Sequence, residues 1–271
     1  MIGRAMILLG VLTVGITTGR ANADERSGGC ARLPDWKDLR QSLSAANAHV
    51  NLILNNNMWA TIVAADGTVC AVAYTGDDAL EAQWLLSRVI SAQKANTANG
   101  LSLQAGEGPN STFKGLALST ANLWKAVQPG GSLYGLQHSN PVSTDVAYRG
   151  SSQAFGTTGD PMVGGRIGGV NVFGGGFALY DDHGRRVGGV GVSGDTSCRD
   201  HMVAWELRHN LHLDFVPTGV ATLVGDTTHP DNIIFDITAN PNGGTGVSKS
   251  GFGHPTCLNT AGSADLHPVV P

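Results

Sequence analysis

The sequence predicts an α+β fold, in which helices pack against an antiparallel β-sheet. Two segments repeat one order of elements, namely strand, turn, strand and helix, the first over residues 59–98 and the second over residues 177–211. In each segment, Asp and Gly residues separate two short apolar runs, which is typical of a β-hairpin. Because a hairpin pairs its strands antiparallel, the pattern favours a layered α+β domain over a parallel nucleotide-binding sheet.

The first half of the predicted domain consists of a helix and a hairpin. The helix covers residues 34–50, with proline and an acidic residue in its first turn. Its apolar positions, spaced to share one face, are Trp36, Leu39, Leu43, Ala46 and Val50. Strands are expected at residues 59–64 and 68–74, and the helix should pack on the sheet that they begin.

The remaining predicted elements are the helix that completes the first segment, the second hairpin and the last helix. A helix is expected at residues 79–98, with Gly100 as its stop. Strands at residues 177–180 and 187–192 form the second hairpin, and the last helix covers residues 200–211. Its apolar stripe consists of Val203, Leu207 and Leu211.

Two stretches lack periodic patterns and are rich in Gly, Ser, Thr and Asn. Residues 104–176 form a long insertion with one helical candidate at 117–127, and loops of such length are more often functional or assembly-forming than idle. Residues 217–271 form a C-terminal extension with one strand expected at 232–237. The predicted domain therefore spans residues 24–216, insertion included, and the extension follows it.

Residues 1–23 have the pattern of a secretory signal peptide. Arg4 precedes an apolar run at 7–16, and small residues end the segment before Asp24. We therefore expect a periplasmic or secreted protein, without membrane insertion because no later stretch is long and apolar enough. Loss of Arg4 and Arg20 reduces the 17 basic residues to 15 against 21 acidic ones, a net charge of −6. That charge argues against nucleic acid or an anionic membrane as a partner.

All four cysteines lie after the predicted signal peptide: Cys30, Cys70, Cys198 and Cys257. An exported chain favours two disulfides over a metal site or a reactive thiol, and no C-x-x-C spacing indicates a zinc knuckle or a redox centre. Four cysteines allow three pairings. We prefer Cys30 with Cys70 and Cys198 with Cys257, because this ties each flanking segment to the nearer half, although the sequence leaves all three open.

Two motifs carry a family resemblance. The pattern A-x-x-K-A-x-T-A is matched at residues 91–98, which read SAQKANTA, except that serine replaces the leading alanine. Residues 184–194 read GRRVGGVGVSG, followed by Asp200. In this order, across about residues 35–215, the chain resembles the GlcG/HbpS-type haem-binding (haem-degrading) family. The resemblance implies a profilin-like fold, a tendency to form homo-oligomers, and binding of haem or a related ligand. The long glycine-rich insertion and the disulfide-bearing tail depart from the family pattern.

The last helix carries the residues that suit a haem. A haem site needs an axial ligand, an apolar slot and cations for the propionates. Spacing places His201, Trp205, Arg208 and His212 on one face, which would supply an imidazole, an aromatic contact and a guanidinium. The alternative is a solvated amphipathic helix whose histidines have no ligand role.

Other histidines offer a different site. His201, His209 and His212 could bind Zn²⁺ or Cu²⁺, although His209 points away from the other two and no carboxylate is certain to complete the set. Loop residues His138, His183 and His254 are expected to be exposed. The sequence therefore leaves a metal site on this helix as a further hypothesis.

The first family motif ends near the end of its helix. Lys94 and Thr97 lie one turn apart there. As motif residues, they would contact a ligand carboxylate or a neighbouring subunit. Equally, a lysine near a helix C-terminus is favourable through the helix dipole alone.

Residues 189–194 match G-x-G-x-x-G, the phosphate-binding pattern of dinucleotide sites. The strand here belongs to an antiparallel hairpin, and Asp195 would repel a pyrophosphate. We therefore expect these glycines to let the helix approach the sheet.

No strong catalytic constellation is evident, so two functions of different classes remain. The first is an exported haem (tetrapyrrole or iron) binding protein, in which haem degradation would follow from activation of oxygen at bound iron. The second is a non-enzymatic, oligomeric structural or signalling module without a cofactor. A third hypothesis is a protein that scavenges divalent metal ions.

Overall fold

A four-stranded antiparallel sheet forms the centre of the molecule. The structure, a computed structural model, describes residues 29–50, 54–106, 114–258 and 266–270. The strands are β1 (Trp59–Ala64), β2 (Val69–Tyr74), β3 (Gly176–Tyr180) and β4 (Arg186–Ser193), in the order β2-β1-β4-β3. The central pair, β1 and β4, joins the two hairpins antiparallel, with Ile62 opposite Val190. The two predicted hairpins therefore form one sheet, as expected.

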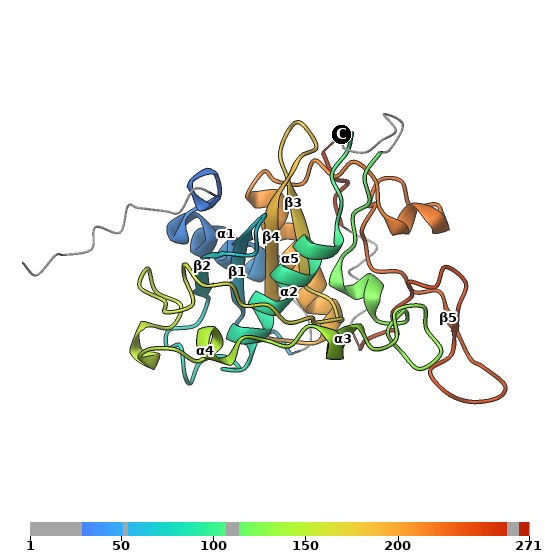
Figure 1. Cartoon of the computed structure of the whole chain (residues 1–271), viewed down its shortest axis with the longest axis horizontal. Helices are drawn as coiled ribbons and strands as arrows, with labels where there is room; N and C mark the ends of the chain where they lie inside the picture. The colour runs from blue at the N-terminus through green and yellow to red at the C-terminus, as the bar shows by residue number, and fades with distance from the viewer. Residues whose placement is uncertain (1–28, 51–53, 107–113, 259–265, 271) are drawn as a thin grey trace, which may run out of the picture.

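Helices cover both faces of this sheet (Figure 1). Residues of β1 alternate, so that Ala60 and Ile62 join a core with α1 (Trp36–His49) and α5 (Ser197–Asn210). Trp59 and Val63 point the other way, into a core with α2 (Ser87–Leu101). This arrangement confirms the predicted α+β class and buries β1 on both sides.

The glycines of β4 allow α2 to lie directly on the sheet. A Cβ at Gly191 would collide with the Ser91 carbonyl oxygen of α2, and one at Gly189 with the Ala95 carbonyl oxygen. The G-x-G-x-x-G match is thus a packing feature, which confirms the structural interpretation of these glycines.

Two helices begin close to their predicted positions and one does not. Asp35 caps α1, accepting a hydrogen bond from the Asp38 N–H in a reciprocal capping box. Thr196 caps α5 by accepting from the Arg199 N–H. The helix expected from residue 79 begins at Ser87, because residues 79–86 form turns in which Asp78 accepts hydrogen bonds from the N–H groups of residues 80 and 81.

The glycine-rich insertion covers the outer side of α2 (green to yellow in Figure 1). Its described residues, which leave out 107–113, contain four short helical turns: η2 (Thr120–Leu123), α3 (Leu136–Ser139), α4 (Thr144–Ala147) and η3 (Ser152–Ala154). The helix expected at 117–127 is thus a 3₁₀ turn followed by further turns. Arg88 of α2 pairs with Asp160, with 2.9 Å between Nε and Oδ2, and both side chains are buried. A helix that would otherwise face solvent is therefore almost fully enclosed.

The C-terminal extension packs against α5. Its regular elements are η4 (Val220–Val224), β5 (Ile237–Thr238) and β6 (Val247–Ser248). The strand predicted at 232–237 is therefore wrong except at Ile237, because residues 232–236 do not pair in a sheet: Ile233 packs in the core that contains α5, whereas Ile234 packs with Leu118 and Val220. No described helix is long and apolar enough to cross a membrane.

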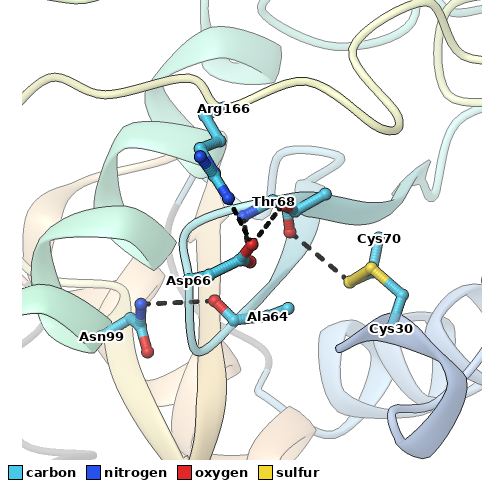
Figure 2. The surroundings of a disulfide bond; sticks show 7 residues. All are labelled: Cys30, Ala64, Asp66, Thr68, Cys70, Asn99 and Arg166. Carbon is cyan, nitrogen blue, oxygen red and sulfur yellow. Dashed lines mark hydrogen bonds and ion pairs between the residues drawn. A yellow bond between two sulfur atoms is a disulfide. The ribbon is translucent and has the colours of Figure 1, made fainter. Parts of the chain in front are cut away.

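Both disulfides have the preferred pairing. Cys30 of η1 (Cys30–Arg32) bonds Cys70 of β2, beside the first hairpin turn (Figure 2). Cys198 of α5 bonds Cys257 and so anchors the extension. The predicted signal peptide lies outside the described residues.

Candidate functional site

The first family motif, residues 91–98, makes its polar contacts inside the protein. Lys94 of α2 donates a hydrogen bond to Asp200 of α5 over 2.7 Å and another to the Val192 carbonyl oxygen over 3.0 Å. Burial lowers the pKa of Lys94 and raises that of Asp200 to about 6, which the positive charge of Lys94 opposes. Because Lys94 is fully buried, its ammonium group is not exposed to a ligand carboxylate.

Thr97 holds the insertion in place. Its hydroxyl donates to the Gln93 carbonyl oxygen over 2.7 Å and accepts from the Asn171 N–H over 3.0 Å. The side chain is buried. In this structure, the motif therefore joins α2 to α5 and to the insertion.

Three of the four residues predicted to form a haem face do share one side of α5. His201, Trp205 and Arg208 are each buried, with at most 1% of their surface exposed. Phe177 of β3 lies against them, its ring centre 4.7 Å from that of His201 and 5.5 Å from that of Trp205. The alternative of a solvated amphipathic helix is wrong, since α5 is buried from Cys198 to Arg208.

Arg208 is paired with an acidic residue of the extension. It forms two hydrogen bonds with Asp231 of the extension, of 2.6 and 2.9 Å. Its guanidinium also lies 4.4 Å from the ring centre of Phe177. A bidentate buried pair of this kind leaves Arg208 unavailable to a propionate in this arrangement.

His201 retains one unused ring nitrogen. The Nε2 atom lies 3.1 Å from the Ile233 N–H nitrogen and 3.1 Å from Asn232 Oδ1. The Nδ1 atom is buried and has no hydrogen-bond partner among the described residues, and it carries the lone pair when the ring proton is on Nε2, facing Asn232 Oδ1. Burial lowers the pKa of His201 to about 3, so the imidazole is neutral at physiological pH. A neutral imidazole with an unused nitrogen has the chemistry of a metal or haem ligand.

The predicted histidine triad does not gather. Three-residue groups with metal-ligand spacing in the described parts of the chain are His209, Asp214 and His267, and separately Cys198, His254 and Cys257. In the second group, Cys198 and Cys257 form a disulfide, so they are not metal ligands. His212 is exposed just beyond α5, where its φ of 54° places it in the left-handed region. Of the three predicted metal ligands, His209 alone belongs to such a group.

His254 differs from its predicted exposure. It is 3% exposed and its Nε2 lies 2.7 Å from the Ser197 hydroxyl, beside the second disulfide. Burial lowers its pKa to about 4. His138 and His183 are exposed, as expected.

Two cavities lie beside the β3–β4 hairpin. One, of about 460 Å³, has mainly apolar walls that include Phe215, Pro217 and Val269. The other, of about 450 Å³, is lined by the side chains of Arg32, Arg185, Arg186, Asp66 and Gln104 among others. Figure 2 shows Asp66 near the first disulfide, paired with Arg166 over 2.7 Å. That hydrogen bond is the main reason why the pKa of Asp66 falls to about 2.

The α5 face thus has chemistry that suits haem but is covered by other described residues in this structure. It offers an imidazole with an unpartnered Nδ1 and two aromatic rings. However, Asn232 and Ile233 cover His201, and neither of the two cavities is lined by a residue of this face.

Comparison with known proteins assigns the family. The family described as haem degrading protein, HbpS-like, matches residues 35–207. The chain belongs to the HbpS-like family. No curated protein matches it.

Three solved structures are similar to this HbpS-like chain. PduOC in complex with haem is 24% identical, with 68% of this chain and 99% of that chain covered and a TM-score of 0.42. Protein ORFY of Klebsiella pneumoniae is 24% identical, with 64% and 87% covered and a TM-score of 0.40. A double mutant of HbpS from Streptomyces reticuli is 13% identical, with 77% and 99% covered and a TM-score of 0.36.

The HbpS-like match contains part of the site. It includes Lys94, Asp200, His201 and Trp205 and ends one residue before Arg208. The extension residues that cover His201 or pair with Arg208 were all missed by sequence reasoning as site residues: Asn232 and Ile233 at His201, and Asp231 at Arg208. They lie in a stretch without periodicity, so no local pattern indicated that they would meet α5.

Proposed function

We propose that this chain binds haem. The observation that carries the proposal is the HbpS-like match over residues 35–207. Further support comes from His201, whose buried Nδ1 has no partner and whose ring lies among Phe177 and Trp205. These residues would supply an axial imidazole and an apolar setting, while bound haem would supply iron-centred redox chemistry.

Access to His201 requires the extension to move. Asn232 and Ile233 contact its imidazole, and the neighbouring Asp231 is paired with Arg208. The Cys198–Cys257 disulfide ties the same extension to α5. We therefore propose that haem competes with residues 231–233 for this face, and that Arg208 becomes free for a propionate when Asp231 leaves.

A haemin titration of the oxidised protein, followed by the Soret band, tests this proposal. We expect saturable binding that is weakened about tenfold or more in His201→Gln and unchanged in His212→Gln, whose side chain is exposed. The double variant Cys198→Ala/Cys257→Ala should bind more tightly, because it releases the cover. Circular dichroism of each variant separates lost binding from lost folding.

The same titration has two contradicting outcomes. Absence of any saturable shift would reject haem binding. A shift that is equal in wild type and His201→Gln would reject the α5 face; loss of that shift in Phe215→Asp would then place haem in the apolar cavity beside the hairpin.

Haem degradation is the finer form of the proposal. We propose that haem bound by this chain is degraded in the presence of a reductant and oxygen. Loss of the Soret band with appearance of an open tetrapyrrole would support it. A Soret band that persists, while free haemin under the same conditions is degraded, would leave a binding protein without this activity.

We further propose that the chain is exported, forms homo-oligomers and consists of a domain at 24–216 followed by an extension. Two disulfides suit an oxidising compartment. An exposed apolar patch precedes α2, with Leu80, Trp84, Leu85 and Leu86 between 43% and 67% exposed. Light scattering of wild type and Trp84→Ser/Leu86→Ser tests assembly through this patch; a monomeric wild type would contradict it.

A cofactor-free structural or signalling module is the alternative function. It is favoured by the full enclosure of His201 and Arg208, whose contacts stabilise the fold without any ligand. A colourless oligomer that does not bind haemin would support it.

A further inference from the structure

A second cluster of ligand-type side chains lies at the C-terminal end of α5. His209 belongs to α5, Asp214 follows it, and His267 comes from the C-terminal segment 266–270. One ligand atom from each residue lies within 4.8 Å of the other two. All three lie beyond residues 35–207, so the cluster is outside the part that matches the family.

Asp214 has an unsatisfied carboxylate oxygen in this cluster. The residue is 1% exposed, and its Oδ2 lies 2.8 Å from His209 Nδ1. Its Oδ1 is buried and has no hydrogen-bond partner in the part of the chain that the structure describes. An ionised carboxylate that is buried with an unpaired oxygen is unfavourable unless a cation satisfies it.

His267 presents a nitrogen to the same place. Its Nδ1 lies 3.1 Å from the Pro268 carbonyl oxygen, so a proton on Nδ1 leaves the Nε2 lone pair free. Nε2 is buried, has no hydrogen-bond partner within the described ranges, and lies 3.5 Å from Glu206 Oε1. The ring centres of His267 and His209 are 3.8 Å apart. Trp205 Nε1 donates a hydrogen bond to the His267 carbonyl oxygen. The imidazole is thus held in position by groups that a metal would not displace, as in protein metal sites.

We propose that His209, Asp214 and His267 bind a divalent transition metal of the zinc class. Two imidazole nitrogens and one carboxylate oxygen form a common three-ligand set for Zn²⁺, with water or Glu206 at the fourth position. The metal would join the C-terminal segment to α5 beside Trp205. It is a site for a structural ion, separate from His201 and independent of haem binding.

The rival explanation is an ion pair without metal. A protonated His267 would face Glu206, which lies 3.2 Å from His49 Nδ1 on its other oxygen. That arrangement satisfies His267 but leaves Asp214 Oδ1 without a partner. Metal binding accounts for both unpartnered atoms, so we favour it.

The test uses untagged, disulfide-intact protein that has been stripped with a chelator and contains no haem. Calorimetric titration with Zn²⁺ should show one saturable site per chain, and Co²⁺ in its place should give visible absorption from imidazole and oxygen ligation. His209→Gln and His267→Gln should each weaken binding about tenfold or more. The control variants His212→Gln and His183→Gln remove exposed histidines outside the cluster and should bind as the wild type does.

Two results would overturn the inference. One is absence of saturable Zn²⁺ uptake by the stripped wild type, and the other is unchanged affinity in both ligand variants. Thermal denaturation adds a readout of folding, because a metal that binds the native chain should raise Tm in wild type and leave Tm of folded His267→Gln unchanged. His201→Gln should retain Zn²⁺ binding, so failure of the haem proposal and failure of this one are distinguishable.

Discussion

Lys94 and Asp200 join helices on opposite faces of the sheet, with 2.7 Å between Nζ and Oδ2 and both side chains fully buried. Asp200 also accepts a hydrogen bond from the Asp195 N–H over 2.8 Å. The lysine that marks the family motif therefore connects α2 to the start of α5. Its position explains why the motif has small neighbours, since α2 must approach β4 closely for Lys94 to reach Asp200.

Removal of Lys94 alone should strongly destabilise the protein. Lys94→Met leaves Asp200 buried without its cation, and breaking one partner of such a pair typically costs about 3–5 kcal/mol. The double variant Lys94→Met/Asp200→Asn should recover part of this loss, because no buried charge remains. Urea denaturation measures both values, and exposed Lys37→Met is the matched control. Equal stability of Lys94→Met and Lys37→Met would contradict the role assigned to the pair.

Two glycine substitutions should have opposite effects. Gly191→Ala would place a methyl group against the Ser91 carbonyl oxygen and should destabilise by about 2 kcal/mol or more, since α2 must move away from β4. Gly100 lies in the exposed last turn of α2 with nothing within 4 Å of its Cβ position. Gly100→Ala should therefore stabilise by up to about 1 kcal/mol. Thermal melts of both variants decide this; comparable melting temperatures would show that α2 does not depend on the glycine contact.

Local patterns predicted the hairpins and α1 because each depends on neighbouring residues, whereas the disulfide pairing was a preference among three that the sequence left open. The Asp/Gly turns fixed both hairpins, and the apolar face of α1 contains the buried residues Leu39, Leu43 and Ala46. The start of α2 was misplaced because Leu85 and Leu86 have the spacing of a buried helix face, whereas both are exposed in turns before α2.

The candidate site could be predicted only in part, because its partners come from distant segments. Spacing placed His201, Trp205 and Arg208 together, yet polar residues on α5 suggested a solvated face. In the structure, Arg199 pairs with the nearby Asp195, whereas Asp200 pairs with Lys94 of α2 and Arg208 pairs with Asp231 of the extension, both from other segments. A helix whose charges are neutralised by remote residues resembles an exposed helix in sequence.

Acid should destabilise the protein before most carboxylates titrate. Burial lowers the pKa of His201 to about 3 and of His254 to about 4, whereas both are near 6.5 when unfolded. Below pH 6.5 the unfolded chain therefore binds more protons than the native chain, and stability falls as pH falls. Asp200, whose pKa burial raises to about 6, has the opposite effect. From pH 7 to 5, we expect a net loss of about 2 kcal/mol in the free energy of unfolding.

Urea titrations at pH 7 and pH 5 measure this loss. His254→Gln should reduce it by more than half, since one buried imidazole no longer titrates. His212→Gln, which removes an exposed histidine, should keep the full dependence. Stability that is equal at both pH values in the wild type would show that the two buried imidazoles are protonated in the native state.

Opening the second disulfide should release the extension from α5 while leaving the sheet intact. Cys198→Ala/Cys257→Ala and Cys30→Ala/Cys70→Ala remove bonds that close chain segments of 59 and 40 residues, so each should cost about 2–4 kcal/mol. Their local effects should differ, because of the two bonds only Cys198–Cys257 ties down the segment that contacts His201 and Arg208. Hydrogen exchange of residues 231–235 should therefore accelerate in Cys198→Ala/Cys257→Ala and stay as in wild type in Cys30→Ala/Cys70→Ala. Equal exchange in both would mean that the Arg208–Asp231 pair and the apolar contacts of Ile233 hold the cover without the disulfide, and that haem could not gain access by reduction of this bond.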